Sequence, residues 1–125
     1  MNKILLFAVL LSFIFSSYAQ KIDAGDRHSI YLCPDGTVKG WWSNTDKQVS
    51  GYAENYVLPQ TIDGIDSVID ISGGTYHTLF LRHDGTVWGI GRNTAGQLGG
   101  LGEDYIHVPT QIPNLSDVIA IAAGG

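Results

Sequence analysis

The chain has 125 residues, and its twelve acidic side chains outnumber its seven basic ones, which gives a formal net charge of −5. An acidic chain without a cluster of lysine or arginine lacks the surface that binds a phosphate backbone, so we expect no nucleic-acid partner. The single cysteine, Cys33, excludes a fold held together by intramolecular disulfides.

The first 19 residues are typical of a secretory signal peptide. Lys3 precedes a largely apolar run over residues 4–15, which is too short to span a bilayer. Ser17 and Ala19 fit the small-residue pattern of a signal peptidase site, so we predict cleavage after Ala19. A retained N-terminal membrane anchor is the alternative. Cleavage would leave residues 20–125 as an exported domain, extracellular, on the cell surface or in the periplasm, with no membrane-inserting segment.

The mature chain repeats itself at an offset of 49 residues, which a single insertion later raises to 50. Residues 22–28 align with residues 71–77 at the start of each copy. We divide the domain into repeat one (22–70), repeat two (71–120) and the start of a third repeat (121–125). Repeats of this length with several short strands are typical of propeller blades or solenoid coils, whose apolar faces need neighbouring repeats to cover them.

Each repeat has the pattern of a strand, a tight turn and a return strand. In repeat two, residues 77–81 are rich in β-formers, and Asp84 followed by Gly85 suits the φ > 0 geometry of a hairpin turn. Leu79 and Phe80 point to opposite sides of the first strand, so both faces need cover. No segment of the mature chain has a helical period, and the pattern predicts an all-β fold.

Repeat two contains a glycine three residues before a histidine, then Asp-Gly, Trp-Gly, Asn and Gly-Gln-Leu-Gly. The order and spacing of these motifs resemble the regulator of chromosome condensation repeat. The resemblance implies a β-propeller of about seven four-stranded antiparallel blades, of which two repeats form a part. We therefore expect either truncation of a longer product or self-association of the chain. The matching residues, which we interpret as structural, are Gly25, His28, Asp35 and Gly36 in repeat one, and Gly74, His77, Asp84, Gly85, Trp88, Gly89, Asn93, Gly96, Gln97, Leu98 and Gly99 in repeat two.

Repeat one departs from the pattern after its return strand. Because residues of very different shape replace glycine and leucine there, we expect the loop to take another shape than in repeat two. Residues 45–58 then either pack as in the family or form a distinct surface feature. The replacements are Trp42, Lys47, Val49 and Ser50, at the positions of Gly91, Gly96, Leu98 and Gly99.

Two long loops, over residues 45–58 and 100–108, are the best candidates for a recognition surface. Aromatic and acidic groups on loops suit a protein partner. Packing of Trp42 between blades is the alternative for that residue. We expect no catalytic residue, no metal site and no cofactor, because the glycine-rich and histidine motifs lack the partners that such chemistry needs. The candidate partner-binding residues are Trp42, Tyr52, Tyr56, Glu103, Asp104 and Tyr105.

The resemblance implies guanine-nucleotide exchange on small GTPases, chromatin binding, or extracellular roles. Export argues against the first two, since those partners are inside the cell. The leading hypothesis is therefore a secreted, non-catalytic binding or scaffold module. The alternative is an enzyme inhibitor that resembles secreted β-lactamase inhibitors of the same repeat class, and a hydrolytic enzyme is the third possibility.

Overall fold

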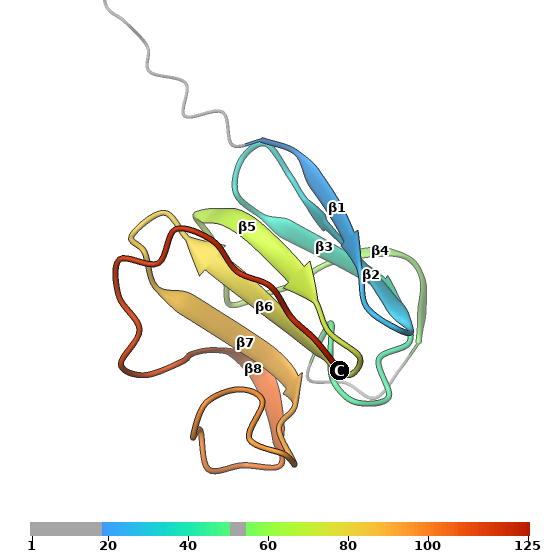
Figure 1. Cartoon of the computed structure of the whole chain (residues 1–125). Coiled ribbons are helices and arrows are strands. Elements are labelled where there is room, and N and C mark those ends of the chain that lie inside the picture. Colours follow the sequence, from blue (N-terminus) through green and yellow to red (C-terminus); the bar gives the residue numbers. More distant parts are fainter. Residues whose placement is uncertain (1–18, 51–54) are drawn as a thin grey trace, which may run out of the picture.

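The computed structural model describes residues 19–50 and 55–125, so nearly all of the predicted signal peptide lies outside the described residues. The described part forms two four-stranded antiparallel sheets with no helix, which confirms the all-β prediction (Figure 1). Consequently, these residues contain no helix that could cross a membrane. Sheet one consists of β1 (Lys21–Ala24), β2 (His28–Leu32), β3 (Val38–Trp42) and β4 (Tyr56–Thr61). Sheet two consists of β5 (Val68–Gly73), β6 (His77–Arg82), β7 (Val87–Arg92) and β8 (Tyr105–Gln111).

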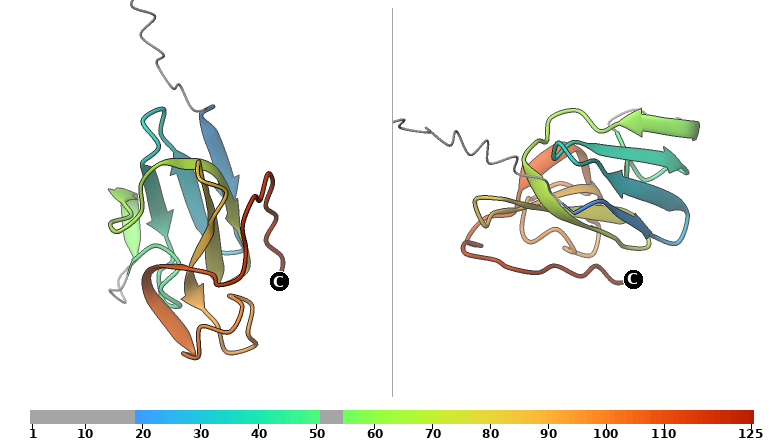
Figure 2. Two further views of the ribbon diagram at one scale, coloured as in Figure 1. Left: turned by 90° about the vertical axis from the view of Figure 1, so that its left-hand side faces the viewer. Right: turned by 90° about the horizontal axis from the view of Figure 1, so that it is seen from above.

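Within each sheet the strands follow one another in chain order, so each sheet is an antiparallel meander of the kind found in a propeller blade. The two sheets stack face to face, as the view from above shows (Figure 2). The chain passes from one sheet to the other between Thr61 and Val68, whereas the sequence period divides it inside β5.

The core between the sheets is built from alternating residues of the facing strands. Phe80 and Ile71 of sheet two pack against Ile30 and Val38 of sheet one, and none of these four side chains is exposed to solvent. Burying a side chain of this size stabilises the fold by roughly 1.5–3 kcal/mol. This packing fixes how the two sheets face each other.

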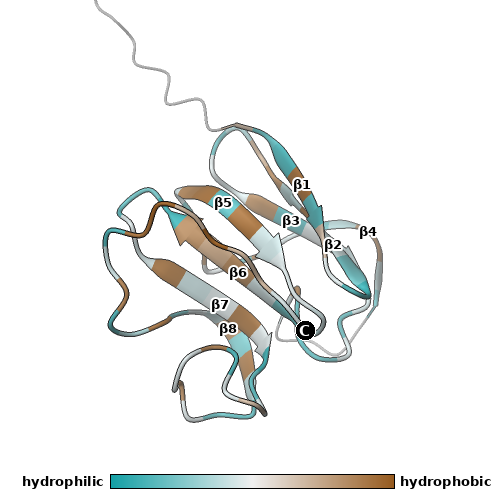
Figure 3. Cartoon of the chain, in the orientation of Figure 1, coloured by the Kyte–Doolittle hydropathy of each residue, from teal (hydrophilic) through white to brown (hydrophobic). Residues whose placement is uncertain are grey.

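A second apolar cluster covers the opposite face of sheet two. Leu81 and Val87 belong to it, and Leu79 and Ile121 pack against it. Phe80 faces the first cluster, so β6 carries apolar side chains on both faces, as its alternation predicted. Figure 3 shows the apolar bands across β5, β6 and β7.

The hairpin turns between the second and third strands of each sheet are equivalent. Gly36 and Gly85 have φ values of 82° and 79°, which favour glycine. Their carbonyl oxygens also accept hydrogen bonds from Val68 and Val118, each at an N···O distance of 3.1 Å. Each turn therefore holds the segment that follows the last strand of its own sheet.

Residues 118–124 lie beside β5, next to the inner edge of sheet two (Figure 1). The Ala123 N–H donates to Ser72 Oγ at 3.0 Å, and the Thr75 N–H donates to the Gly124 carbonyl at 3.1 Å. The Gly73 N–H donates in the same way to Asp23 Oδ2 at 3.0 Å. This segment therefore meets sheet two as β5 meets sheet one.

The loops that follow β3 and β7 have the same hydrogen-bonding pattern over residues 44–49 and 93–98. Asn44 Oδ1 accepts from the Val49 N–H, and Asn93 Oδ1 accepts from the Leu98 N–H, both at 2.8 Å. A glutamine side chain accepts from a backbone N–H two residues earlier in each loop, at 3.0 and 2.9 Å. Over residues 44–49, the expectation that repeat one takes another shape was therefore wrong.

The physical reason is that two non-glycine residues adopt the backbone conformation of glycine. Trp42 and Lys47 have φ values of 85° and 64°, and the equivalent Gly91 and Gly96 have values of 111° and 74°. Lys47 lies between the residues that the Asn44 and Gln48 side chains bind, and these hydrogen bonds hold the loop in the conformation that gives it positive φ. The conformation of the chain here therefore overrides the usual preference of non-glycine residues for negative φ.

Candidate functional site

The candidate partner-binding residues that the structure describes lie in or beside the connections from β3 to β4 and from β7 to β8 (Figure 1). Glu103 and Asp104 are exposed in the second of these connections. Tyr105 begins β8. Tyr52 lies outside the described residues.

Tyr56 was expected in a loop, and the structure corrects this. It is the first residue of β4, paired with Trp42 of β3. Its ring packs against the core between the sheets, and its hydroxyl lies 3.2 Å from Ser50 Oγ. The packing of the ring against the core favours extension of the strand to this residue.

Trp42 presents an exposed aromatic surface beside a cavity. Its side chain is 65% exposed, and nearby Val57 is 83% exposed. A cavity of about 270 Å³ is lined by Trp42, Ser43, Asn55, Tyr56 and Val57. We call these five residues the Trp42 surface. Exposed aromatic and aliphatic groups around a hollow are suited to receive an apolar side chain of another protein.

The backbone at Trp42 is unfavourable for a side chain. At the equivalent Gly91, an added Cβ would lie only 2.6 Å from the Tyr76 carbonyl oxygen and 2.9 Å from His77 Cα. Left-handed backbone costs a residue with a Cβ roughly 1–2 kcal/mol. Because most of the Trp42 side chain is exposed, burial offsets little of this cost. The packing of the fold therefore does not account for tryptophan at this position.

His28 stands directly across from Trp42 in the pairing of β2 with β3. It is 2% exposed, and its Nε2 lies 2.9 Å from Thr78 Oγ1 in sheet two. The Thr78 hydroxyl donates to the Gln48 carbonyl at 2.8 Å, so it accepts its other bond from the His28 Nε2–H. Burial lowers the pKa of His28 to about 4, and neighbouring His77 adds to this effect.

A glycine precedes each of the two repeated histidines by three residues, for a steric reason. A Cβ at Gly25 would lie 2.8 Å from His28 Nδ1, and one at Gly74 would lie 2.7 Å from His77 Nδ1. Burial also lowers the pKa of His77. Both histidines are packed inside the structure, at positions where they cannot reach a substrate in solution.

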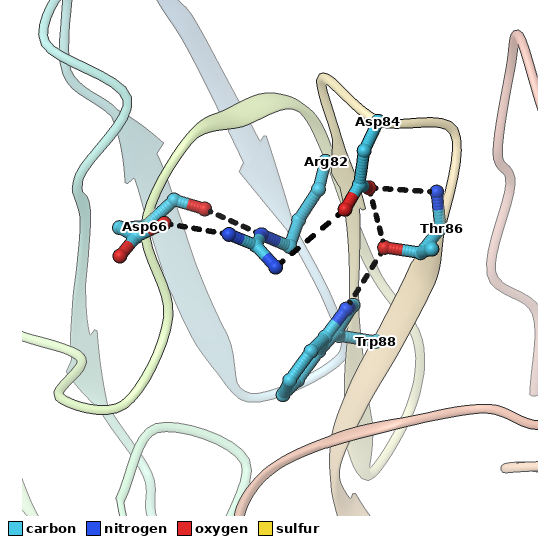
Figure 4. Close-up of polar contacts among 5 residues, drawn as sticks. All are labelled: Asp66, Arg82, Asp84, Thr86 and Trp88. Carbon is cyan, nitrogen blue, oxygen red and sulfur yellow. Dashed lines mark hydrogen bonds and ion pairs between the residues drawn. The ribbon is translucent and has the colours of Figure 1, made fainter.

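A polar cluster around Arg82 lies at the other end of sheet two (Figure 4). Arg82 Nη2 donates to Asp66 Oδ1 at 2.8 Å, and the guanidinium lies 5.4 Å from the centroid of the Trp88 ring. The pKa of Asp66 is lowered by hydrogen bonding from Ser67 and then from Arg82. The cluster ties the connection between the sheets to sheet two, away from the Trp42 surface.

Sequence reasoning missed Arg82, Asp66 and Val57. Repeat one has Cys33 at the position of Arg82, so the repeat gave no signal for an ion pair there. The exposure of Val57 follows from its place on the outermost strand of sheet one, which the sequence pattern did not delimit.

Two antiparallel meanders, joined by the same turn-to-strand and strand-to-loop contacts, define consecutive blades of a β-propeller. Matches to the regulator of chromosome condensation (RCC1) repeat cover residues 84–125 and residues 68–97. Residues 68–125 of the chain therefore carry repeats of the RCC1 family. No curated protein sequence matches it significantly.

Solved structures with the same fold include Prp20p from Saccharomyces cerevisiae, which is 25% identical with a TM-score of 0.71 over 84% of this chain and 29% of that one. Yeast RCC1 (Prp20) bound by Kap60 is 23% identical, with a TM-score of 0.68 over 84% of this chain and 28% of that one. Human WBSCR16 is 20% identical, with a TM-score of 0.64 over 75% of this chain and 25% of that one. The chain therefore spans between a quarter and 29% of the length of these proteins.

Proposed function

We propose that this chain is an exported, non-catalytic protein-binding module whose partner contacts the Trp42 surface. The observation that carries the proposal is Trp42 itself, an exposed indole held at a φ of 85° beside a cavity of about 270 Å³. Strained backbone that packing does not explain is concentrated at functional sites. A tryptophan that anchors a partner is also among the commonest hot spots of protein interfaces.

The solved relatives support a protein as the partner. The structure of Prp20p was described together with its binding to Gsp1p and histones, and a second structure holds Kap60 bound to yeast RCC1. The shared scaffold is compatible with recognition of different proteins, while the recognising residues are specific to each chain. For the present chain, the predicted signal peptide supports a partner outside the cytoplasm.

A non-catalytic role is supported by the placement of the residues that could perform chemistry. His28 and His77 are buried and packed against glycine backbone, and the carboxylates of Asp35 and Asp84 bind their own turns.

Site-specific photo-cross-linking in the cell that produces the chain tests the proposal. A photoreactive residue replaces Trp42 in one variant and Asp35 in the control, which is exposed at the opposite end of the same sheet. We expect position 42 to cross-link to one protein species. We expect no cross-link to that species from position 35. Equal labelling from both positions, or no protein adduct at position 42, would contradict the proposal. An adduct with a hydrolase that the chain inhibits would specify the partner as an enzyme.

A further inference from the structure

We propose that the Trp42 surface is loosened by acid, and that His28 is the residue through which acidification reaches it. The inference concerns regulation of the proposed binding site and therefore rests on the proposed function. The structural change itself takes place in the chain alone and can be measured without a partner.

His28 is connected to the Trp42 surface in two ways. In the register of sheet one, His28 pairs with Trp42, which in turn pairs with Tyr56, so the three residues form one row across β2, β3 and β4. In addition, His28 donates to the Thr78 hydroxyl, which donates to the Gln48 carbonyl in the loop between Trp42 and Tyr56. The histidine thus supports both the strand and the loop.

The direction of the hydrogen bonds fixes which nitrogen of His28 carries the proton. Because Nε2 donates to Thr78, Nδ1 is the unprotonated nitrogen of the neutral ring. Nδ1 is buried and has no hydrogen-bond partner in the described part of the chain. It faces the backbone of Gly25, where even a Cβ would lie at only 2.8 Å. A proton added to Nδ1 would be a buried charge on a donor without an acceptor, which is costly.

The charged and titratable groups around His28 do not remove this cost. His77, at the start of β6, acts against protonation, and Asp23 of β1 acts in its favour. Burial outweighs Asp23, so the pKa of His28 falls from 6.5 to about 4 in the closed structure. An opened form with a solvated imidazole has the ordinary pKa and takes up the proton first. As pH falls below 6.5, the opened form therefore gains population relative to the closed form.

When His28 opens, the Thr78 hydroxyl loses its hydrogen-bond donor, and the orientation from which it donates to the Gln48 carbonyl is no longer fixed. The next bonds in this loop are those from the Val49 and Ser50 N–H groups to Asn44 Oδ1, at 2.8 and 3.0 Å. These two amides therefore report directly on the loop. Their hydrogen exchange can be followed by NMR in the full exported chain.

The test compares exchange of the Val49 and Ser50 amides at pH 7 and pH 5, corrected for intrinsic exchange rates. We expect protection in the wild type to fall about twentyfold, as linkage to one group with these two pKa values requires. His28→Gln keeps an Nε2–H donor for Thr78 but cannot titrate, so its protection should change less than about twofold. His107→Gln, at an exposed position, is the matched control and should behave as the wild type.

Equal loss of protection in the wild type and in His28→Gln would overturn the inference, as would constant protection in the wild type. If His28→Gln does not fold, direct NMR titration of the His28 ring in the wild type decides. A pKa below 5 supports the coupling, and a pKa of 6 or above refutes it. None of these outcomes depends on a partner, so failure of the cross-linking experiment would leave this result intact.

Discussion

Lys21 and Asp70 occupy equivalent positions, each immediately before one of the two repeats, and they form an ion pair with each other in the folded chain. Lys21 Nζ lies 2.7 Å from Asp70 Oδ1 and donates also to the Ile71 carbonyl at 2.8 Å. The pair joins β1 to β5, the inner strands of the two sheets. A position that differs between the two copies, lysine in one and aspartate in the other, thus provides a contact between the two sheets.

Reversing one charge of this pair should destabilise the chain. Lys21→Asp places two carboxylates together and removes the bond to Ile71, and we expect a loss of about 1 kcal/mol, because the pair is partly exposed. The double variant Lys21→Asp, Asp70→Lys should recover part of the loss. Urea unfolding of the two single variants and the double variant gives the coupling free energy. Additive effects would show that the ion pair contributes nothing.

Lys47→Gly should stabilise the chain by roughly 0.5–1 kcal/mol, because Lys47 has a φ of 64° and glycine relieves that strain. Gly96→Lys is the mirror experiment in repeat two. Gly96 has a φ of 74° and no atom within 4 Å of an added Cβ, so backbone strain alone should destabilise this variant by about 1 kcal/mol. Midpoints of chemical denaturation measure both. The same sign for the two changes would refute the equivalence of the loops.

Gly74→Ala should prevent folding or cost more than about 3 kcal/mol. Its Cβ would lie 2.7 Å from His77 Nδ1 and 2.7 Å from the Gly124 carbonyl oxygen, so it would clash with a buried ring and with backbone at once. Gly124→Ala is the matched control, since nothing lies within 4 Å of its added Cβ. Circular dichroism during thermal unfolding should show a native-like melt for the control and little or none for Gly74→Ala. A melt of Gly74→Ala within a few degrees of the wild type would contradict the packing described.

Acidification should lower the global stability of the chain before its carboxylates titrate. The pKa of His28 is about 4 when folded and 6.5 in the reference state, so the unfolded chain binds more protons between these values. The free energy of unfolding therefore falls as pH drops below 6.5, by up to about 2 kcal/mol at pH 5 from this residue. The lowered pKa of His77 acts in the same direction. Thermal melts between pH 7.5 and 5 measure the effect, and a flat profile would exclude buried neutral histidines.

Much of the fold follows from the sequence. The dipeptides at Asp35 and Asp84 predict the hairpins, and the alternation around Phe80 predicts a strand with two apolar faces. These signals depend on residues close together in the sequence, and the hairpin signal occurs once in each repeat. By contrast, the sequence wrongly predicted a new loop shape from Trp42 and Lys47. Residues other than glycine rarely adopt positive φ, but the hydrogen bonds of neighbouring side chains override that preference here.

The candidate site was predicted only in part. Aromatic residues near the loops drew attention to Trp42 and Tyr56, but their pairing with His28 required the register of the sheet. The strain at Trp42 became visible only when its backbone could be compared with Gly91. Such relationships depend on geometry between strands, which composition and spacing do not specify.

The free energy of unfolding of Trp42→Gly is the most direct test of the central claim, that tryptophan at position 42 serves binding rather than folding. Glycine relieves the φ of 85° and removes an indole that is 65% exposed. We predict a gain in stability of about 1 kcal/mol. A loss of more than about 1 kcal/mol would show that the indole holds the fold together, and would contradict the claim.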